Sequence, residues 1–332
     1  MLTRFCSAAI VLAGFCLSAC STLPTPLSPN GPATTAYIQG RANEIVEYSA
    51  AASGGSPSGI LTPPLSYSFC SAVATDEAGQ LYVFASDGAP NYKILIYPPN
   101  STGTANPLRT VDINISSASA FAVGPSGLLY VFQAGENGGT SVTVYSIGSS
   151  EAVPLHTLQV STIETPQDVA VDGTGNIYVV GSTTPAYNSS PYAIEVYSAT
   201  ATGTDAPVRS IGSSAQLYGV AVDAAGHIFA NVMLDDGRNC AIEEFGADAD
   251  GVVAPINTIT LPQQTADIVS GGPVRLDAAG NVFVSVRLIT FDSPTQTYVV
   301  YGFASDSTGH ATPTVQITPS TTDVITIAFA VN

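Results

Sequence analysis

A motif of ten residues is repeated along this chain of 332 residues, and it constrains the fold more than any other feature. Each copy has a short apolar segment, an Asp-x-x-Gly turn (Gly-x-x-Gly in the second copy) and a second apolar segment that ends in an aromatic residue. The copies are Val73–Tyr82, Phe121–Tyr130, Val169–Tyr178, Val220–Phe229 and Val274–Phe283. The last glycines of their turns follow one another at intervals of 48, 48, 51 and 54 residues. A period of this length is typical of solenoids, propellers and other repeat architectures.

The rest of each repeat also follows one pattern, which completes a unit of four strands. A third apolar strand ends in an aromatic residue, and a proline follows nine or ten residues later. The aromatic residues are Tyr97, Tyr145, Tyr197, Phe245 and Phe303, and the prolines are Pro107, Pro154, Pro207, Pro255 and Pro313. Four strands per unit at this period predict the blades of an all-β propeller.

The two ends of the chain supply a sixth unit. Residues 329–332 (Phe-Ala-Val-Asn) match the first strand of a repeat, and residues 36–40 (Ala-Tyr-Ile-Gln-Gly) match the second strand. Residues 44–48 match the third strand, and Pro57 follows Tyr48 by nine residues. We therefore predict a six-bladed β-propeller of four-stranded antiparallel blades over residues 36–332. The N- and C-terminal strands share the last blade, which closes the ring without an open seam.

This repeat resembles that of NHL-type and related six-bladed propellers, which contain a Val-Ala-Val-Asp-x-x-Gly-Asn-Ile-Tyr-Val core. Residues 169–179 read Val-Ala-Val-Asp-Gly-Thr-Gly-Asn-Ile-Tyr-Val. The similarity covers about residues 36–332. The resemblance implies the architecture, but it does not select an activity, because such propellers serve as binding scaffolds, lyases, lactonases and sensors.

The N-terminal residues have the pattern of a bacterial export signal. Arg4 precedes a mostly apolar segment, residues 5–17, that is too short to cross a bilayer as a permanent helix. Leu17-Ser18-Ala19-Cys20 resembles a lipobox, which implies cleavage before Cys20 and attachment of lipid, such as palmitate, at that cysteine. The alternative is an ordinary signal peptide with a chance cysteine.

We accordingly expect a lipoprotein signal peptide over residues 1–19 and a tether rich in Pro, Ser and Thr over residues 20–35. Ser21 resembles the residue found in lipoproteins that are passed on to the outer membrane. The expected location is therefore the bacterial cell envelope, with the membrane contacted through the lipid on Cys20. The protein would face the periplasm or the cell surface.

The charge of the chain argues against nucleic acid as a partner. The formal net charge is −17, and removal of residues 1–19, which contain Arg4 and no acid, takes it to −18. Such a field repels phosphate backbones, which proteins bind through clusters of Lys and Arg. A cationic partner, or divalent cations bound diffusely, fits the sign better.

The repeated aspartates have a structural explanation. Asp at the first position of a turn accepts hydrogen bonds from nearby N–H groups, and Gly at the fourth position accepts a positive φ. Gly124 and Asn332 replace the aspartate in two units, which a shared metal-binding role would not tolerate. Asp248 and Asp250 resemble part of a calcium loop, although a solvated turn is the favoured interpretation. We expect no catalytic residue, no metal site and no cofactor.

Two charged residues break the apolar pattern of the innermost strands. Lactonase-type propellers hold a divalent cation at the axis with Glu, Asp and Asn, whereas Val, Ala, Phe and Thr occupy those positions here. Asp168 precedes one of these segments, and Arg275 replaces an alanine in another. Arg275 requires an acidic partner, for which Asp168 and Asp267 are candidates, or an anionic ligand.

In a propeller, the loops between strands 2 and 3 and the connections from strand 4 to the next strand 1 share one face. We expect this face, with the axial pair, to carry the binding residues. The candidates are Tyr67, Tyr92, Asp168, Tyr187, Tyr192, Tyr218, Asp235, Asp236, Arg238, Arg275, Arg287 and Phe291. Aromatic and polar residues on adaptable loops are suited to recognition of a protein or glycan.

The favoured hypothesis is a monomeric binding scaffold for an envelope protein, a cell-wall polymer or a glycan. One alternative is a hydrolase or lyase with an axial site, similar to gluconolactonases, and another is a structural spacer of the envelope. Cys70 and Cys240 belong to blades on opposite sides of the ring, so we expect two buried thiols and no disulfide between them.

Overall fold

The structure is a computed structural model that describes residues 34–331 apart from several short segments. The segments left out are 41–43, 50–53, 55, 65–68, 89–90, 116–117, 135–138, 184–191, 235, 264–265, 267, 292–295 and 320–323. The backbone alone is described for residues 69–71, 87–88, 91, 268 and 324–329. The predicted signal peptide, Cys20 and all but the last two residues of the predicted tether lie outside the described residues.

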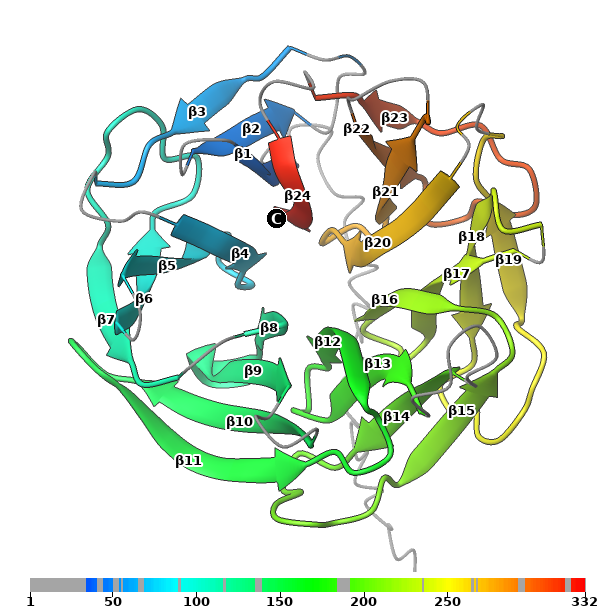
Figure 1. Ribbon diagram of the computed structural model, residues 1–332, viewed down its shortest axis with the longest axis horizontal. Coiled ribbons are helices and arrows are strands. Elements are labelled where there is room, and N and C mark those ends of the chain that lie inside the picture. Colours follow the sequence, from blue (N-terminus) through cyan, green and yellow to red (C-terminus); the bar gives the residue numbers. More distant parts are fainter. Residues whose placement is uncertain are drawn as a thin grey trace, which may run out of the picture. The chain divides into compact units, whose positions relative to one another are not determined.

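Six four-stranded antiparallel sheets are arranged as blades around a central axis (Figure 1). Blade 1 contains β4 (Phe69–Thr75), β5 (Leu81–Gly88), β6 (Asn91–Tyr97) and β7 (Arg109–Ile113). Blade 2 contains β8 (Ala120–Val123), β9 (Leu129–Ala134), β10 (Thr140–Ile147) and β11 (Ala152–Gln159). Blade 3 contains β12 (Thr165–Val171), β13 (Ile177–Ser182), β14 (Tyr192–Tyr197) and β15 (Arg209–Ser213).

Blade 4 contains β16 (Leu217–Val222), β17 (Ile228–Met233), β18 (Cys240–Phe245) and β19 (Asn257–Thr260). Blade 5 contains β20 (Ile268–Leu276), β21 (Val282–Ile289), β22 (Gln296–Phe303) and β23 (Val315–Ile317). Blade 6 contains β24 (Val324–Val331), β1 (Thr35–Gly40), β2 (Ile45–Ser49) and β3 (Gly59–Leu61). The predicted all-β, six-bladed architecture is confirmed. Within the described part of the chain, no helix is long and apolar enough to cross a membrane.

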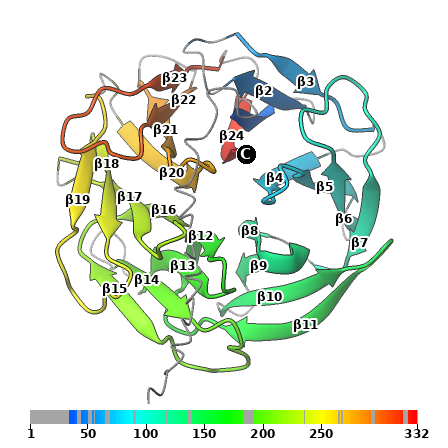
Figure 2. The same ribbon diagram turned by 180° about the vertical axis from the view of Figure 1, so that it is seen from behind.

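The sixth blade joins the two ends of the chain, as predicted from the sequence. Strand β24 pairs antiparallel with β1, and the partners are Ala36 with Val331, Tyr37 with Ala330 and Ile38 with Phe329. Both views show the red C-terminal strand beside the dark blue β1 at the centre of the ring (Figures 1 and 2). Each residue pair across this contact is separated by nearly the whole sequence, so the contact closes the ring.

The ring is closed at the inner and outer radius. The innermost strands β4, β8, β12, β16, β20 and β24 each contact the next one around the axis, including β24 with β4. At the rim, an isolated parallel bridge joins the last strand of each blade to the turn between strands 3 and 4 of the next blade. The six bridges are Asp112 with Glu151, Leu158 with Gly203, Ile211 with Gly251, Ile259 with Gly309, Gly54 with Ile317 and Leu61 with Gly103.

The hydrophobic core lies between the blades. Six clusters of buried apolar side chains occur, and each draws its members from two neighbouring blades. The second strands supply large buried rings to these clusters, such as Tyr82 and Phe132. Because apolar burial is the main favourable term in folding, each blade depends on its two neighbours for stability.

The Asp-x-x-Gly segments are turns with internally satisfied hydrogen bonds. Asp172 Oδ1 accepts the N–H groups of Thr174 (2.8 Å) and Asn176 (2.9 Å), and its Oδ2 accepts the Tyr178 hydroxyl at 3.1 Å. Gly175 has a φ of +88°. Partial burial acts to raise the pKa of Asp172, but the hydrogen bonds from Thr174 and Asn176 lower it overall. The structural interpretation of these aspartates is thus confirmed.

The second copy of the turn needs a glycine for a steric reason. A Cβ atom on Gly124 would lie 2.6 Å from Cε2 of Tyr130, so an aspartate does not fit without a shift of that ring. The segment instead forms a short 3-10 turn over Pro125–Gly127.

Candidate functional site

The axis of the propeller contains a small cavity with mostly apolar walls. Its volume is about 170 Å³, and residues from all six innermost strands line it. The alanine position of the repeat contributes Ala74, Ala122, Ala170, Ala221 and Ala330, and Arg275 takes that position in blade 5. Thr75 is the other polar residue of the lining, and its hydroxyl donates to the Val331 carbonyl at 2.7 Å.

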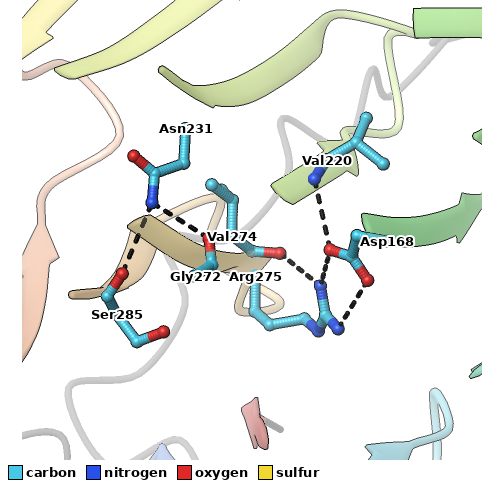
Figure 3. Close-up of polar contacts among 7 residues, drawn as sticks. All are labelled: Asp168, Val220, Asn231, Gly272, Val274, Arg275 and Ser285. Carbon is cyan, nitrogen blue, oxygen red and sulfur yellow. Dashed lines mark hydrogen bonds and ion pairs between the residues drawn. The ribbon is translucent and has the colours of Figure 1, made fainter. Parts of the chain in front are cut away.

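Arg275 and Asp168 form an ion pair that crosses a blade. Nη1 of Arg275 lies 2.7 Å from Oδ2 of Asp168, and Nη2 lies 3.1 Å from Oδ1. Asp168 belongs to β12 of blade 3 and Arg275 to β20 of blade 5, so the pair spans blade 4 (Figure 3). The backbone N–H of Val220, in blade 4, donates to Oδ2 of the same carboxylate at 3.2 Å. Of the alternatives that the sequence left open for Arg275, the structure shows an acidic partner, and that partner is Asp168.

Local backbone geometry makes this pair possible. The pairing of β12 with β13 shifts register between Pro166 and Asp168, and an extra residue at such a bulge redirects the side chains that follow. In blade 4, a Cβ atom on Gly219 would lie 2.7 Å from the Gly272 carbonyl oxygen, so β16 and β20 approach too closely for a larger residue. Asp168 is 1% exposed and Arg275 is partly exposed toward the cavity.

The end of the propeller that carries the loops between strands 2 and 3 is hereafter the 2–3/4–1 face. We predicted that Tyr92, Tyr192, Tyr218 and Arg287 lie in its loops, but this is wrong: the four residues lie within β6, β14, β16 and β21, and they are partly buried. The blade 5 hairpin shows the reason, since β21 and β22 stay paired as far as Ile289 and Gln296. The apolar pattern of the strands continues farther than the turn residues indicated.

The loop residues at this face differ from these tyrosines in exposure. Phe291 is 73% exposed, and Asp236 and Arg238 are exposed as well. Asp236 Oδ1 accepts the N–H of Arg238 at 2.9 Å and the N–H of Asn239 at 3.0 Å, so it stabilises its own turn. Hydrogen bonds lower the pKa of the Asp236 carboxyl, and the bond from the Arg238 backbone N–H has the largest effect. Three other candidates, Tyr67, Tyr187 and Asp235, lie outside the described residues.

Tyr218 is a partly buried aromatic candidate on β16. Its ring packs against Gly271. A Cβ atom at position 271 would lie only 2.3 Å from Cδ2 of Tyr218, so only glycine fits there without a shift of the ring. Burial raises the pKa of Tyr218 to about 12, and the nearby Cys240 acts in the same direction. Cys240 is a free, buried thiol whose pKa burial raises to about 12, so it has little thiolate at neutral pH. The prediction of a buried thiol is confirmed for Cys240; the Cys70 side chain is not described.

Among the residues that the structure describes, no three His, Cys, Asp or Glu side chains come together to hold a metal ion. The segment with Asp248 and Asp250 is a turn at the rim. Asp250 Oδ1 accepts the N–H of Ser210 in blade 3 at 2.9 Å, and Gly251 forms the bridge to Ile211. That role in joining two blades explains Asp250 without a calcium ion.

Sequence reasoning missed a set of buried polar residues on the second strands. Asn231, Ser285 and Gln39 occupy equivalent positions in blades 4, 5 and 6, two residues after the aromatic residue of the motif. The equivalent residues of blades 1 to 3 are Phe84, Phe132 and Val180. When the six repeats are aligned, this position changes from apolar in blades 1 to 3 to polar in blades 4 to 6, so these buried polar residues could have been found from the sequence.

Comparison with known proteins gives limited matches. Residues 160–185, which include β12 and β13, match a family model described as a beta-propeller repeat (SBBP). No curated protein sequence matches the chain.

Two solved structures are similar over most of the chain. The allergen Mala s 1 of Malassezia sympodialis is 11% identical, with a TM-score of 0.44 over 74% of this chain and 76% of that one. The WD40 domain of Toxoplasma gondii coronin is 12% identical, with a TM-score of 0.36 over 73% of this chain and 71% of that one. The repeat match and the six four-stranded blades agree that this chain is a β-propeller.

Proposed function

We propose that this chain is a lipid-anchored, extracytoplasmic propeller of the NHL-like type that binds a partner in the cell envelope through its 2–3/4–1 face. The partner is an envelope protein, a cell-wall polymer or a glycan. One observation carries the proposal: the loops of this face include an exposed aromatic side chain, Phe291, and the exposed charges of Asp236 and Arg238. Exposed aromatic residues are enriched among the groups that dominate binding energy at interfaces.

The turns at the opposite end of the blades are a further reason to place the binding site at the 2–3/4–1 face. These Asp-x-x-Gly turns use their carboxylates for their own N–H groups, as Asp76, Asp172, Asp223 and Asp277 show. These groups are already hydrogen-bonded, so they offer less to a partner than the variable loops at the 2–3/4–1 face.

The polar residues that line the axial cavity support a binding function better than a hydrolytic one. Of its two polar lining residues, Thr75 donates to a carbonyl and Arg275 is paired with Asp168. A hydrolase or lyase with an axial site would need an acid, base or nucleophile that faces the cavity and is available for substrate. Among the described residues that line the cavity, none offers such a group apart from Arg275, which is paired with Asp168.

The test is site-specific crosslinking in the native envelope. A photo-crosslinking residue is placed at Phe291, and a matched one at Leu108, which is 59% exposed at the outer rim of blade 1. The proposal predicts one discrete adduct from position 291 and none from position 108, and it predicts that the Phe291→Ser substitution abolishes partner capture while Leu108→Ser does not. Equal adducts from both positions, or no adduct at 291, would contradict the proposal.

The anchor has a separate test. Cells fed a clickable palmitate analogue should label the wild-type protein and not the Cys20→Ala variant. Cys16, the other cysteine near the lipobox, follows the bulky Phe15, so Cys16→Ala should be labelled as strongly as wild type. Labelling that survives Cys20→Ala would show that the anchor is elsewhere.

A further inference from the structure

The interfaces between blades differ on the two sides of the ring. Blades 1 to 3 place Phe84, Phe132 and Val180 at the position two residues after the motif aromatic, and these side chains join the hydrophobic clusters. Blades 4 to 6 place Asn231, Ser285 and Gln39 there, which are 0%, 3% and 2% exposed. Each of these three has a buried side-chain atom without a hydrogen-bond partner: Oδ1 of Asn231, Oγ of Ser285 and Oε1 of Gln39.

Asn231 uses its other amide atom to hold the backbone of blade 5. Its Nδ2 donates to the Gly272 carbonyl at 2.9 Å and approaches the Ser285 carbonyl at 3.4 Å (Figure 3). Gly272 belongs to the bulge of β20, where the register shifts between Gly271 and Val274. The hydroxyl of Ser285 points away from this amide in Figure 3 and has no partner of its own.

A cation lies next to Ser285 on the same strand. Arg287 follows two residues later, so both side chains project from the same face of β21. The Nε atom of Arg287 is buried without a hydrogen-bond partner. In the register of blade 5, Ser270 and Tyr298 are the cross-strand neighbours of Arg287 on its two sides.

The other described cations on strands have partners. Arg275 pairs with Asp168, Lys93 pairs with Asp112, and Arg109 and Arg209 donate to the carbonyls of Gly148 and Ala249. For Arg287, by contrast, no described carboxylate lies within ion-pair distance, although the chain has 25 acidic residues. A partly buried guanidinium without a counter-charge is destabilising unless something from outside neutralises it.

We propose that Arg287 and Ser285 form a binding site for a small oxyanion, a carboxylate or a phosphate group, at the interface of blades 5 and 6. The guanidinium presents Nε and Nη donors in the planar fork that matches two oxygens of such a group. The Ser285 hydroxyl supplies a third donor from the adjacent position. The bound oxyanion accepts hydrogen bonds from Arg287 Nε and Ser285 Oγ, and it neutralises a guanidinium that has no ion-pair partner among the described carboxylates.

This inference rests on the proposed function in one respect, since it gives the partner of the 2–3/4–1 face an acidic group. The two proposals can fail separately. The oxyanion site is measured with small anions and without any partner, whereas the binding face is measured by crosslinking at Phe291.

The experiment is a titration of the full mature chain, followed through the side-chain Nε–Hε signals of its arginines by 15N NMR. The Arg287 signal is assigned as the one that is lost in Arg287→Gln. Sodium acetate and sodium phosphate are titrated separately, at constant ionic strength maintained with chloride. We expect the Arg287 signal to shift and saturate with at least one oxyanion, and the stronger of the two to identify the ligand class.

Two variants keep the result interpretable. Ser285→Ala should weaken the apparent affinity roughly tenfold, because it removes one hydrogen bond to a charged group. Arg109→Gln, which removes a cation of blade 1 that donates to the Gly148 carbonyl, should leave the Arg287 shift unchanged, and thermal unfolding checks that each variant is folded. A shift that never saturates, that chloride reproduces, or that is unchanged in folded Ser285→Ala would overturn the proposal.

Discussion

At the scale of single residues, the ion pair between Asp168 and Arg275 is the clearest departure from the repeat. The sequence identified both residues, because each interrupts an apolar pattern that the other blades keep. It left Asp267 as a second partner for Arg275, since the bulge that directs Asp168 toward the axis has no signature of its own. Asp168 and Arg275 are 107 residues apart in the sequence, so only the tertiary structure shows which of the two acids is the partner.

Removal of Arg275 should destabilise the protein strongly. The Arg275→Ala substitution leaves the Asp168 carboxylate buried without a counter-charge, and losses from such broken pairs are about 3–5 kcal/mol. The double variant Asp168→Asn/Arg275→Ala removes the charge and keeps an oxygen acceptor for the Val220 N–H, so it should recover most of that loss. Urea unfolding of the wild type and the variants measures both values. A double variant as unstable as Arg275→Ala would show that the charge is not the cause.

Glu47 should make the stability depend on pH near neutrality. Burial raises its pKa from 4.5 to about 7, so the folded protein favours the protonated carboxyl. The stabilisation associated with this shift is complete below about pH 4.5 and is lost as the pH rises through about 7. Thermal unfolding of wild type and Glu47→Gln at pH 5 and pH 8 tests this, with Glu77→Gln as the exposed control. We expect Glu47→Gln to lose less stability between pH 5 and pH 8 than wild type; the same loss in both would refute the assignment.

At the scale of elements, most of the blades could be predicted from the repeat. The motif located strands 1 and 2, and the aromatic-to-proline spacing located strands 3 and 4. Proline opens the last strand in most blades, but Pro154 lies inside β11, which continues across a register shift beside Tyr145. The parallel bridges at the rim were not predicted, because a single pair of backbone groups between blades has no residue pattern.

The Asp-x-x-Gly turn is predicted to contribute modestly and locally. Asp172→Ala removes the acceptor of two backbone N–H groups and of the Tyr178 hydroxyl, which should destabilise the protein by about 1–3 kcal/mol. Ser126→Ala, in the blade 2 turn that lacks the aspartate, is the control and should change stability far less. Thermal unfolding of both variants provides the comparison. Equal effects would mean that the Asp172 carboxylate has no special role.

At the scale of the whole molecule, the ring explains why the termini matter. Each hydrophobic cluster needs two blades, so a missing strand in blade 6 would expose the faces of blades 1 and 5. The candidate binding face was predictable as an end of the propeller, while its individual side chains were not. Strand lengths decide which residues are in loops, and the apolar pattern at strand ends does not determine them.

The closed six-bladed ring depends on the contact between the C-terminal strand β24 and β1. The direct measurement is disulfide mapping by mass spectrometry of the oxidised Ala36→Cys/Val331→Cys variant, in which the two residues are cross-strand partners with buried side chains. We predict a crosslinked peptide that joins positions 36 and 331, and none in Ala36→Cys/Ala120→Cys, where the second residue is in blade 2. The absence of the 36–331 crosslink in folded protein, or equal crosslinking in the control, would contradict the closed six-bladed ring.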